Sequence, residues 1–106
     1  MPELYPRAGE PIIDKPGKGA FFATSLGHLL AKAGVRNLIF CGVTSDCCVH
    51  TTMTNANDMG YECLVVSDGS AALETRNHDM IMAITAKHGG QFGAVASADT
   101  ALDALA

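Results

Sequence analysis

The stretch LIFCGVTSDCCVHTTMTNAN, residues 38–57, predicts a strand, a tight turn and a helix in direct succession. Residues 38–43 form an apolar run with little alternation, which is typical of a parallel strand covered on both faces. Residues 44–46 supply the turn. The helix is expected to begin at residues 47–48 and to end at Gly60, because glycine commonly follows the last helical turn. The stretch therefore predicts the first half of a parallel α/β unit.

Two adjacent cysteines, Cys47 and Cys48, lie at the expected start of this helix. Backbone N–H groups point outward there and the helix dipole is positive, and both effects favour a thiolate over a thiol. A thiolate is the nucleophile of cysteine chemistry. Spacing alone does not choose between the two residues. It also leaves open that both are small buried packing residues, which is common for free cysteine.

The segment GVTSDCCV, residues 42–49, is followed by Thr51, Thr52 and a Gly-Tyr-Glu turn at residues 60–62. This arrangement resembles the isochorismatase-like cysteine hydrolases, whose pattern runs G-[VI]-[AT]-[TS]-D-x-C-V before a threonine-bearing helix and a G-[YF]-[ED] turn. The resemblance places the nucleophile on Cys48. It implies that Cys47 occupies the variable position before the nucleophile.

The same resemblance implies a cis peptide bond between Val43 and Thr44. It further implies that the backbone N–H groups of Thr44 and Cys48 form an oxyanion hole, which would stabilise a tetrahedral intermediate.

Residues 12–24, IIDKPGKGAFFAT, resemble a second motif of this family, in which a lysine precedes a small residue, a phenylalanine and a capping threonine. The resemblance implies that Lys15 is the catalytic lysine, which would stabilise the thiolate and the anionic intermediate. From the residues alone, without the resemblance, Lys15 is predicted to be a solvated surface lysine. Lys18 is the second choice for the catalytic role.

The other polar candidates receive structural roles. Asp46 is expected to cap the helix or lie in the turn, and Asp68 to line the rim of a pocket or end a strand. His50 follows Cys48 by two positions on the helix and is expected to face away from it. No ligand spacing or glycine-rich phosphate motif occurs, so we expect neither a metal nor a cofactor. The remaining histidines are expected at the surface: His28, His78 and His88.

Strand and helix patterns alternate along the chain, which predicts βαβ units and a parallel sheet with helices on both faces. Ligands of such sheets bind at the carboxyl ends of the strands, where Lys15, Cys48 and Asp68 are all expected. Besides the opening stretch, we expect strands at 12–14, 62–67 and 94–96, and helices between Thr24 and Gly34, at 77–88 and at 98–105.

The length of 106 residues and the net charge of −4 predict a single domain without a nucleic-acid surface. No apolar run is long enough to cross a membrane, and the first residues do not resemble a signal peptide. The four cysteines include no C-x-x-C pair, so a zinc module is not expected. Cys41 and Cys63 lie in predicted strands as packing residues, and a reducing cytoplasm is the expected location.

One family motif is missing from these residues. The general base of the family is an aspartate at the end of an N-terminal strand, commonly in D-x-Q-x-x-F, and Asp14 does not match it. The resemblance covers nearly the whole chain but only about the C-terminal half of the family fold. We therefore expect a Rossmann-like, partial isochorismatase-like domain over residues 1–106, with residues 1–11 as an extended arm. Such a sheet would expose an apolar edge, which favours a homo-oligomer.

The resemblance implies hydrolysis of a C–N bond in a small amide or ureide, such as biuret or ureidoacrylate, through a thioester. Without the aspartate, the activity of this chain is expected to be impaired. One alternative is a non-catalytic chain, either a truncated remnant or a subunit that binds a partner along its open edge. Another is an unrelated flavodoxin-like binding module, which would lack a reactive thiol.

Overall fold

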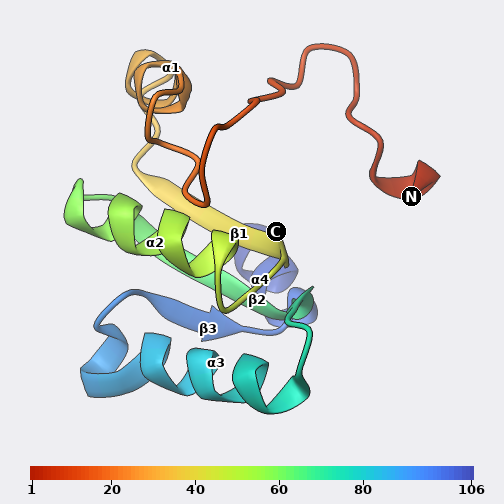
Figure 1. Cartoon of the computed structure of the whole chain (residues 1–106), viewed down its shortest axis with the longest axis vertical. Coiled ribbons are helices and arrows are strands. Elements are labelled where there is room, and N and C mark those ends of the chain that lie inside the picture. Colours follow the sequence, from red (N-terminus) through yellow and green to blue (C-terminus); the bar gives the residue numbers. More distant parts are fainter.

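The computed structural model describes all 106 residues and confirms an α/β fold built on a parallel sheet (Figure 1). A short 3₁₀ helix, η1, spans Pro2–Leu4. The elements that follow are α1 (Leu26–Lys32), β1 (Asn37–Val43), α2 (Cys48–Asp58), β2 (Glu62–Ala71), α3 (Thr75–Gly90), β3 (Ala94–Ala96) and α4 (Ala98–Leu105).

The sheet has three parallel strands in the order β1-β2-β3, so β1 lies at an edge. The strand expected at residues 12–14 is absent, because this segment pairs with no neighbouring strand. β2 is longer than expected and continues to Ala71. Its register with β1 shifts between Phe40 and Gly42, so that Gly42 pairs with Ser70 and the two strands stay together to their ends. Asp68 therefore lies within β2 rather than after it.

One face of the sheet is covered by α2 and α3. The core on this face joins Val49, Met53 and Ala56 of α2 to Cys63 and Val65 of β2. Met53 and Val65 are each only 1% exposed. The helical spacing of apolar residues predicts that α2 has one buried side, and this is confirmed, since its apolar side lies against the middle strand.

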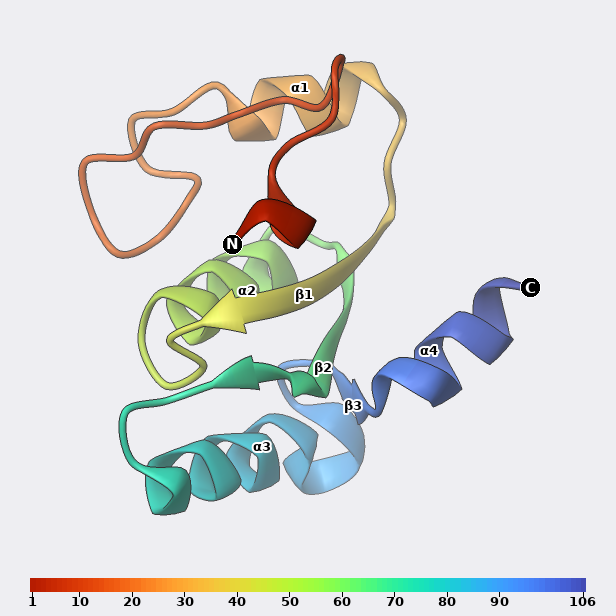
Figure 2. The ribbon, with the colours of Figure 1, turned by 90° about the vertical axis from the view of Figure 1, so that its right-hand side faces the viewer.

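The opposite face is only partly covered. α4 packs there alone, against β2, and α1 is set apart from the sheet (Figures 1 and 2). The expectation that β1 is covered on both faces is therefore wrong: exposed and half-buried residues alternate along it, and Ile39 and Val43 are 47% and 71% exposed. The reason is that α4, the helix on this side, packs mainly against β2 and leaves most of β1 uncovered.

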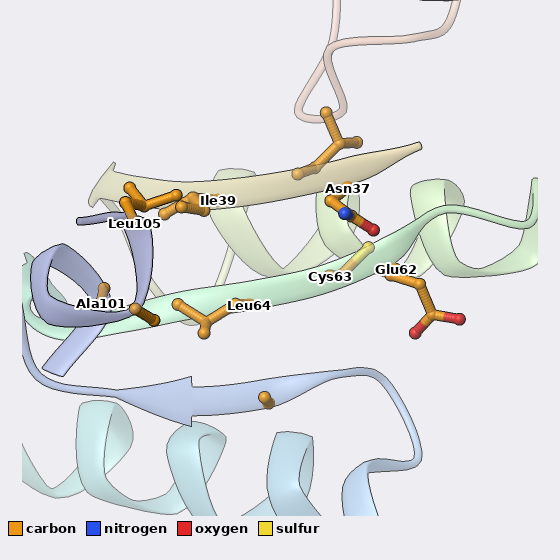
Figure 3. A pocket seen from close by; sticks show the side chains of 10 residues that line it. Asn37, Ile39, Glu62, Cys63, Leu64, Ala101 and Leu105 are labelled. Carbon is orange, nitrogen blue, oxygen red and sulfur yellow. The ribbon is translucent and has the colours of Figure 1, made fainter. Parts of the chain in front are cut away.

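A hollow of about 340 Å³ lies beside α4 on this open face (Figure 3). Ile39 of β1, Leu64 of β2 and the helix residues Ala101 and Leu105 contribute to its mostly apolar lining. A second hollow, of about 410 Å³, lies along the same face and includes Leu4 of η1. Residues 1–12 are exposed along their length.

Helix ends follow the sequence closely, with small shifts. Ser25 rather than Thr24 directly precedes α1, although the Thr24 Oγ1 accepts a hydrogen bond from the Leu26 N–H at 3.3 Å. Ser97 caps α4, because its Oγ accepts from the Thr100 N–H at 3.2 Å. No helix is both long and apolar enough to span a bilayer.

Candidate active site

Cys48 is the first residue of α2 and follows directly on the turn that leaves the edge strand β1. Its side chain is half-buried, as is that of Cys47, which holds the N-cap position. Asp46 is exposed and lies in the turn, which is one of the two roles expected for it; the other, capping, is wrong, because no side chain caps the helix. The chain therefore presents a thiol at the uncapped N-terminus of an eleven-residue helix.

The backbone amides of the turn fall into two groups. The N–H groups of Cys47 and Val49 both donate to the Thr44 carbonyl at 3.1 Å, and the Ser45 N–H donates to the Ala71 carbonyl at 2.8 Å. The N–H groups of Thr44 and Cys48 have no acceptor within the chain, and the same holds for those of Asp46 and His50. The Thr44 and Cys48 N–H groups, at the start of the turn and at the nucleophile candidate, are thus available to a ligand. The Thr44 N–H belongs to the Val43–Thr44 peptide bond, which is cis.

Lys15 lies in an exposed loop before α1. Its ammonium donates to the carbonyl oxygens of Gly17 and Lys18, at 2.8 and 3.1 Å, and has no hydrogen bond to Cys48. An ammonium has three donors, so these bonds orient Lys15 and leave one donor free. Lys18 is exposed and contributes only its carbonyl.

The Lys15 loop is fastened to α2 close to Cys48. The Ala20 N–H donates to the Thr52 Oγ1 at 3.0 Å, and the same hydroxyl donates to the Cys48 carbonyl at 2.8 Å. Gly19 makes the close approach possible, since a Cβ there would lie 3.0 Å from the Asn55 amide nitrogen. The structure thus brings the loop and the cysteine helix together, although it does not join the two functional groups directly.

A partly buried hydrogen bond between Ser45 and His78 joins the turn to α3. The Ser45 Oγ and the His78 Nδ1 are 2.8 Å apart, and Ser45 is only 1% exposed. His78 was expected at the surface but is half-buried on α3, because α3 packs beside the turn. Sequence reasoning missed this pair, since the residues lie 33 positions apart and no local spacing links them.

The other polar candidates lie away from the thiol. His50 packs edge-on against Phe92, with ring centroids 5.4 Å apart, and burial lowers its pKa below the usual 6.5. The Asp68 carboxylate accepts from the Ala98 N–H at 2.7 Å and so holds the start of α4. It does not contact the turn. No group of three or more metal-ligating side chains occurs in the structure.

A parallel α/β sheet with a cysteine at the start of the helix that follows one strand defines a class of proteins rather than a single enzyme. The sequence model of the Isochorismatase domain matches residues 1–100. The chain therefore belongs to the isochorismatase family.

Individual relatives agree with this assignment. The ureidoacrylate amidohydrolase RutB of Azorhizobium caulinodans is 29% identical over 68 residues, which cover 64% of this chain and 30% of that protein. An isochorismatase-like hydrolase from Alkaliphilus metalliredigens matches with a TM-score of 0.93 at 28% identity, over 100% of this chain and 57% of its own. The nicotinamidase SaPncA of Staphylococcus aureus matches with a TM-score of 0.74 at 28% identity, over 80% of this chain and 52% of its own. The chain thus spans about a third to somewhat over half the length of these relatives.

Proposed function

We propose that this chain carries the nucleophile of a cysteine-dependent hydrolase that cleaves C–N bonds in small amides or ureides. The observation that carries the proposal is the pair of N–H groups, of Thr44 and Cys48, that have no acceptor within the chain and flank the turn at Cys48. Donors fixed in advance at the point where negative charge develops are commonly the largest source of stabilisation in acyl transfer. Cys48 is the residue whose own N–H belongs to this pair, which favours it over Cys47.

The reaction would proceed in two stages. The Cys48 Sγ attacks the substrate carbonyl carbon, and the resulting oxyanion accepts hydrogen bonds from the two free N–H groups. Collapse breaks the C–N bond, the nitrogen leaves with a proton as ammonia or an amine, and a thioester remains. Water then attacks the thioester carbon, the C–S bond breaks, and the acid and the Cys48 thiol are released.

Lys15 is proposed to stabilise the anionic states of this reaction. The two carbonyl bonds within its loop fix the ammonium, and the bonds through Thr52 fix the loop against the cysteine helix. One donor of the ammonium remains for the substrate. Lys18, which has no side-chain hydrogen bond, is the natural comparison residue.

The substrate class is suggested by what the relatives are named for. One is a ureidoacrylate amidohydrolase and another is a nicotinamidase, so a ureide and an aromatic amide represent the two kinds of substrate. Both names describe cleavage at a carbonyl bonded to nitrogen. This is the bond that a thiolate beside an oxyanion site can cleave.

The activity of the 106 residues alone is proposed to be impaired. They contain no D-x-Q-x-x-F motif, and in the structure no aspartate or glutamate is hydrogen-bonded to Cys48. General acid–base help is typically worth about 10²–10⁴-fold in rate. The thiol can therefore keep its reactivity toward alkylating agents while turnover, which also needs a proton for the leaving amine, falls.

The test is ammonia release from biuret, ureidoacrylate and nicotinamide. The chain is assayed alone and with the D-x-Q-bearing N-terminal segment of a family member, fused or added separately. We expect turnover about 10²–10⁴-fold higher with the segment, abolished by Cys48→Ala and retained in the matched Cys47→Ala variant. Turnover that survives Cys48→Ala but not Cys47→Ala would contradict the assignment of the nucleophile.

The alternative is a non-catalytic subunit that binds a partner along β1. The observation that favours it is the open edge and the exposed Ile39 and Val43 beside it. The same assay separates the two proposals. The absence of Cys48-dependent turnover from all three substrates, with the segment present and the protein folded, would favour the binding role.

A further inference from the structure

The hydrogen bond between Ser45 and His78 joins the cysteine turn to a helix that begins about thirty residues later. Ser45 is 1% exposed, and the Ser45 Oγ to His78 Nδ1 distance is 2.8 Å. His78 lies in the first turn of α3, where its own N–H donates to the Glu74 carbonyl. A buried hydroxyl with a single side-chain partner is costly to leave unpaired, so this contact constrains both elements.

A serine within hydrogen-bond reach of a histidine also has the geometry of a nucleophile and its base. The burial of Ser45 argues against that role, because a side chain that is 1% exposed cannot meet a substrate carbonyl. The histidine ring contacts it through Nδ1, and no carboxylate is hydrogen-bonded to His78 to orient the ring. The pair is therefore placed to hold the turn rather than to react.

Ser45 transmits this constraint through a rigid peptide group. The Thr44–Ser45 peptide is planar, so its carbonyl and its N–H move together. The N–H donates to the Ala71 carbonyl at the end of β2, and the Thr44 carbonyl accepts from Cys47 and Val49, on either side of Cys48. Fixing the Ser45 side chain thus fixes the carbonyl on which the first turn of α2 is built.

We propose that His78 is a positioning residue of this site, which holds the free N–H groups of Thr44 and Cys48 in place through Ser45. This inference rests on the proposed function for its purpose, since a fixed oxyanion site matters only if Cys48 reacts. The constraint acts on the backbone around Cys48, whose free N–H groups favour the thiolate, whatever the substrate is.

The experiment compares two variants of similar chemistry. His78→Asn places a polar atom near the position of Nδ1, and its amide can donate or accept, so it can bond Ser45 in either direction. His78→Gln places its polar atoms near the position of Nε2, where the structure has no bond to Ser45. Iodoacetamide labelling of the full chain, followed by mass spectrometry, gives a separate alkylation rate for each cysteine.

We expect His78→Gln to slow alkylation of Cys48 by about threefold to tenfold, the effect of losing one hydrogen bond of ordinary strength, and His78→Asn to restore it. Alkylation of buried Cys63 reports on folding and should stay at the wild-type rate in both variants. If His78→Gln raises the Cys63 rate, that variant disturbs the fold, and Ser45→Ala is used in its place. Ser45→Ala removes the same hydrogen bond and adds no volume. The expected slowing of Cys48 is the same.

Equal Cys48 rates in the wild type, His78→Gln and Ser45→Ala would overturn the inference, as would an Asn variant as slow as the Gln variant. Each comparison measures the alkylation rate of one thiol in two variants. Its outcome therefore does not depend on whether the chain releases ammonia. No Cys48-dependent turnover even with the D-x-Q-bearing N-terminal segment present, together with the expected pattern of alkylation rates, would disprove the proposed function and support the positioning role.

Discussion

The two faces of the sheet differ in how much of the chain lies over them. On one face, α2 and α3 bury Met53 and Val65 to 1% exposure. On the other, α4 stands alone and leaves Ile39 47% exposed. The hydrogen bonds that reach the cysteine turn from other elements come from the end of β2 and from the helices of the covered face, and they include those of Ala71, His78 and Thr52.

This difference shows that the local site and the completeness of the sheet are separate properties. The covered face provides the packing and the hydrogen bonds that shape the turn, and all of these come from residues of this chain. The open face contributes no hydrogen bond to the turn. A site can therefore be well formed locally while the strand that leads into it remains unpaired on its outer side.

The largest expected effect is a loss of stability on the covered face. Met53→Ala should lower the free energy of unfolding by about 2–5 kcal/mol, because it leaves a cavity among Val49, Ala56 and Val65. Met80→Ala is the matched control, since Met80 is 60% exposed on α3 and should lose far less. Urea unfolding measures both. Equal losses would mean that the covered face is not the core.

A smaller effect concerns the pH dependence of stability through His50. Burial lowers the pKa of His50 below 6.5, so the unfolded chain binds this proton more readily than the folded chain. The contribution of neutral His50 to the free energy of unfolding is fully present above about pH 6.5, and it is lost as the pH falls from there through the lower folded pKa.

Urea unfolding at about pH 7.5 and about pH 5.5 measures this loss. His50→Leu should reduce the difference between the two conditions, whereas His28→Gln, on the exposed side of α1, should leave it unchanged. A wild-type difference that persists in full in His50→Leu would assign the pH dependence to another group.

The smallest effect on folding is expected on the open face, where association should change instead. We propose that two copies pair along β1, because its outer backbone groups are unpaired and its side chains are apolar. Ile39→Lys should alter the free energy of unfolding by less than about 1 kcal/mol but shift the chain toward monomer in sedimentation. Met80→Lys, at another exposed apolar site, should leave association as it is. A wild-type monomer at micromolar concentration would contradict this prediction.

Much of the fold could be predicted from the sequence because its signals are local. The apolar run before Gly42 and the helical spacing of Val49, Met53 and Ala56 depend only on neighbours along the chain. The parallel sheet then follows from the alternation of strand and helix. Two predictions were wrong: the strand at residues 12–14, and the helix cover over both faces of β1. Both depend on partners that a short apolar pattern does not specify.

The candidate site divides in the same way. The place of Cys48 at the start of α2 follows from its local pattern. The bond from Ser45 to His78 could not be predicted, because it depends on how α3 packs beside the turn. Likewise, nothing in the spacing of Lys15 indicates that its ammonium is held by the carbonyls of its own loop.

The Thr52 hydroxyl gives the connection between loop and helix a fixed polarity. Its one hydrogen is directed to the Cys48 carbonyl, so only a lone pair remains for the Ala20 N–H. The two bonds therefore point the same way, from the loop amide through the hydroxyl to the helix carbonyl, and each polarises the other. Valine has the shape of threonine without the oxygen and would break both bonds at once, whereas serine would preserve them. A single oxygen atom thus links, by hydrogen bonds, the loop that carries the lysine to the helix that carries the cysteine.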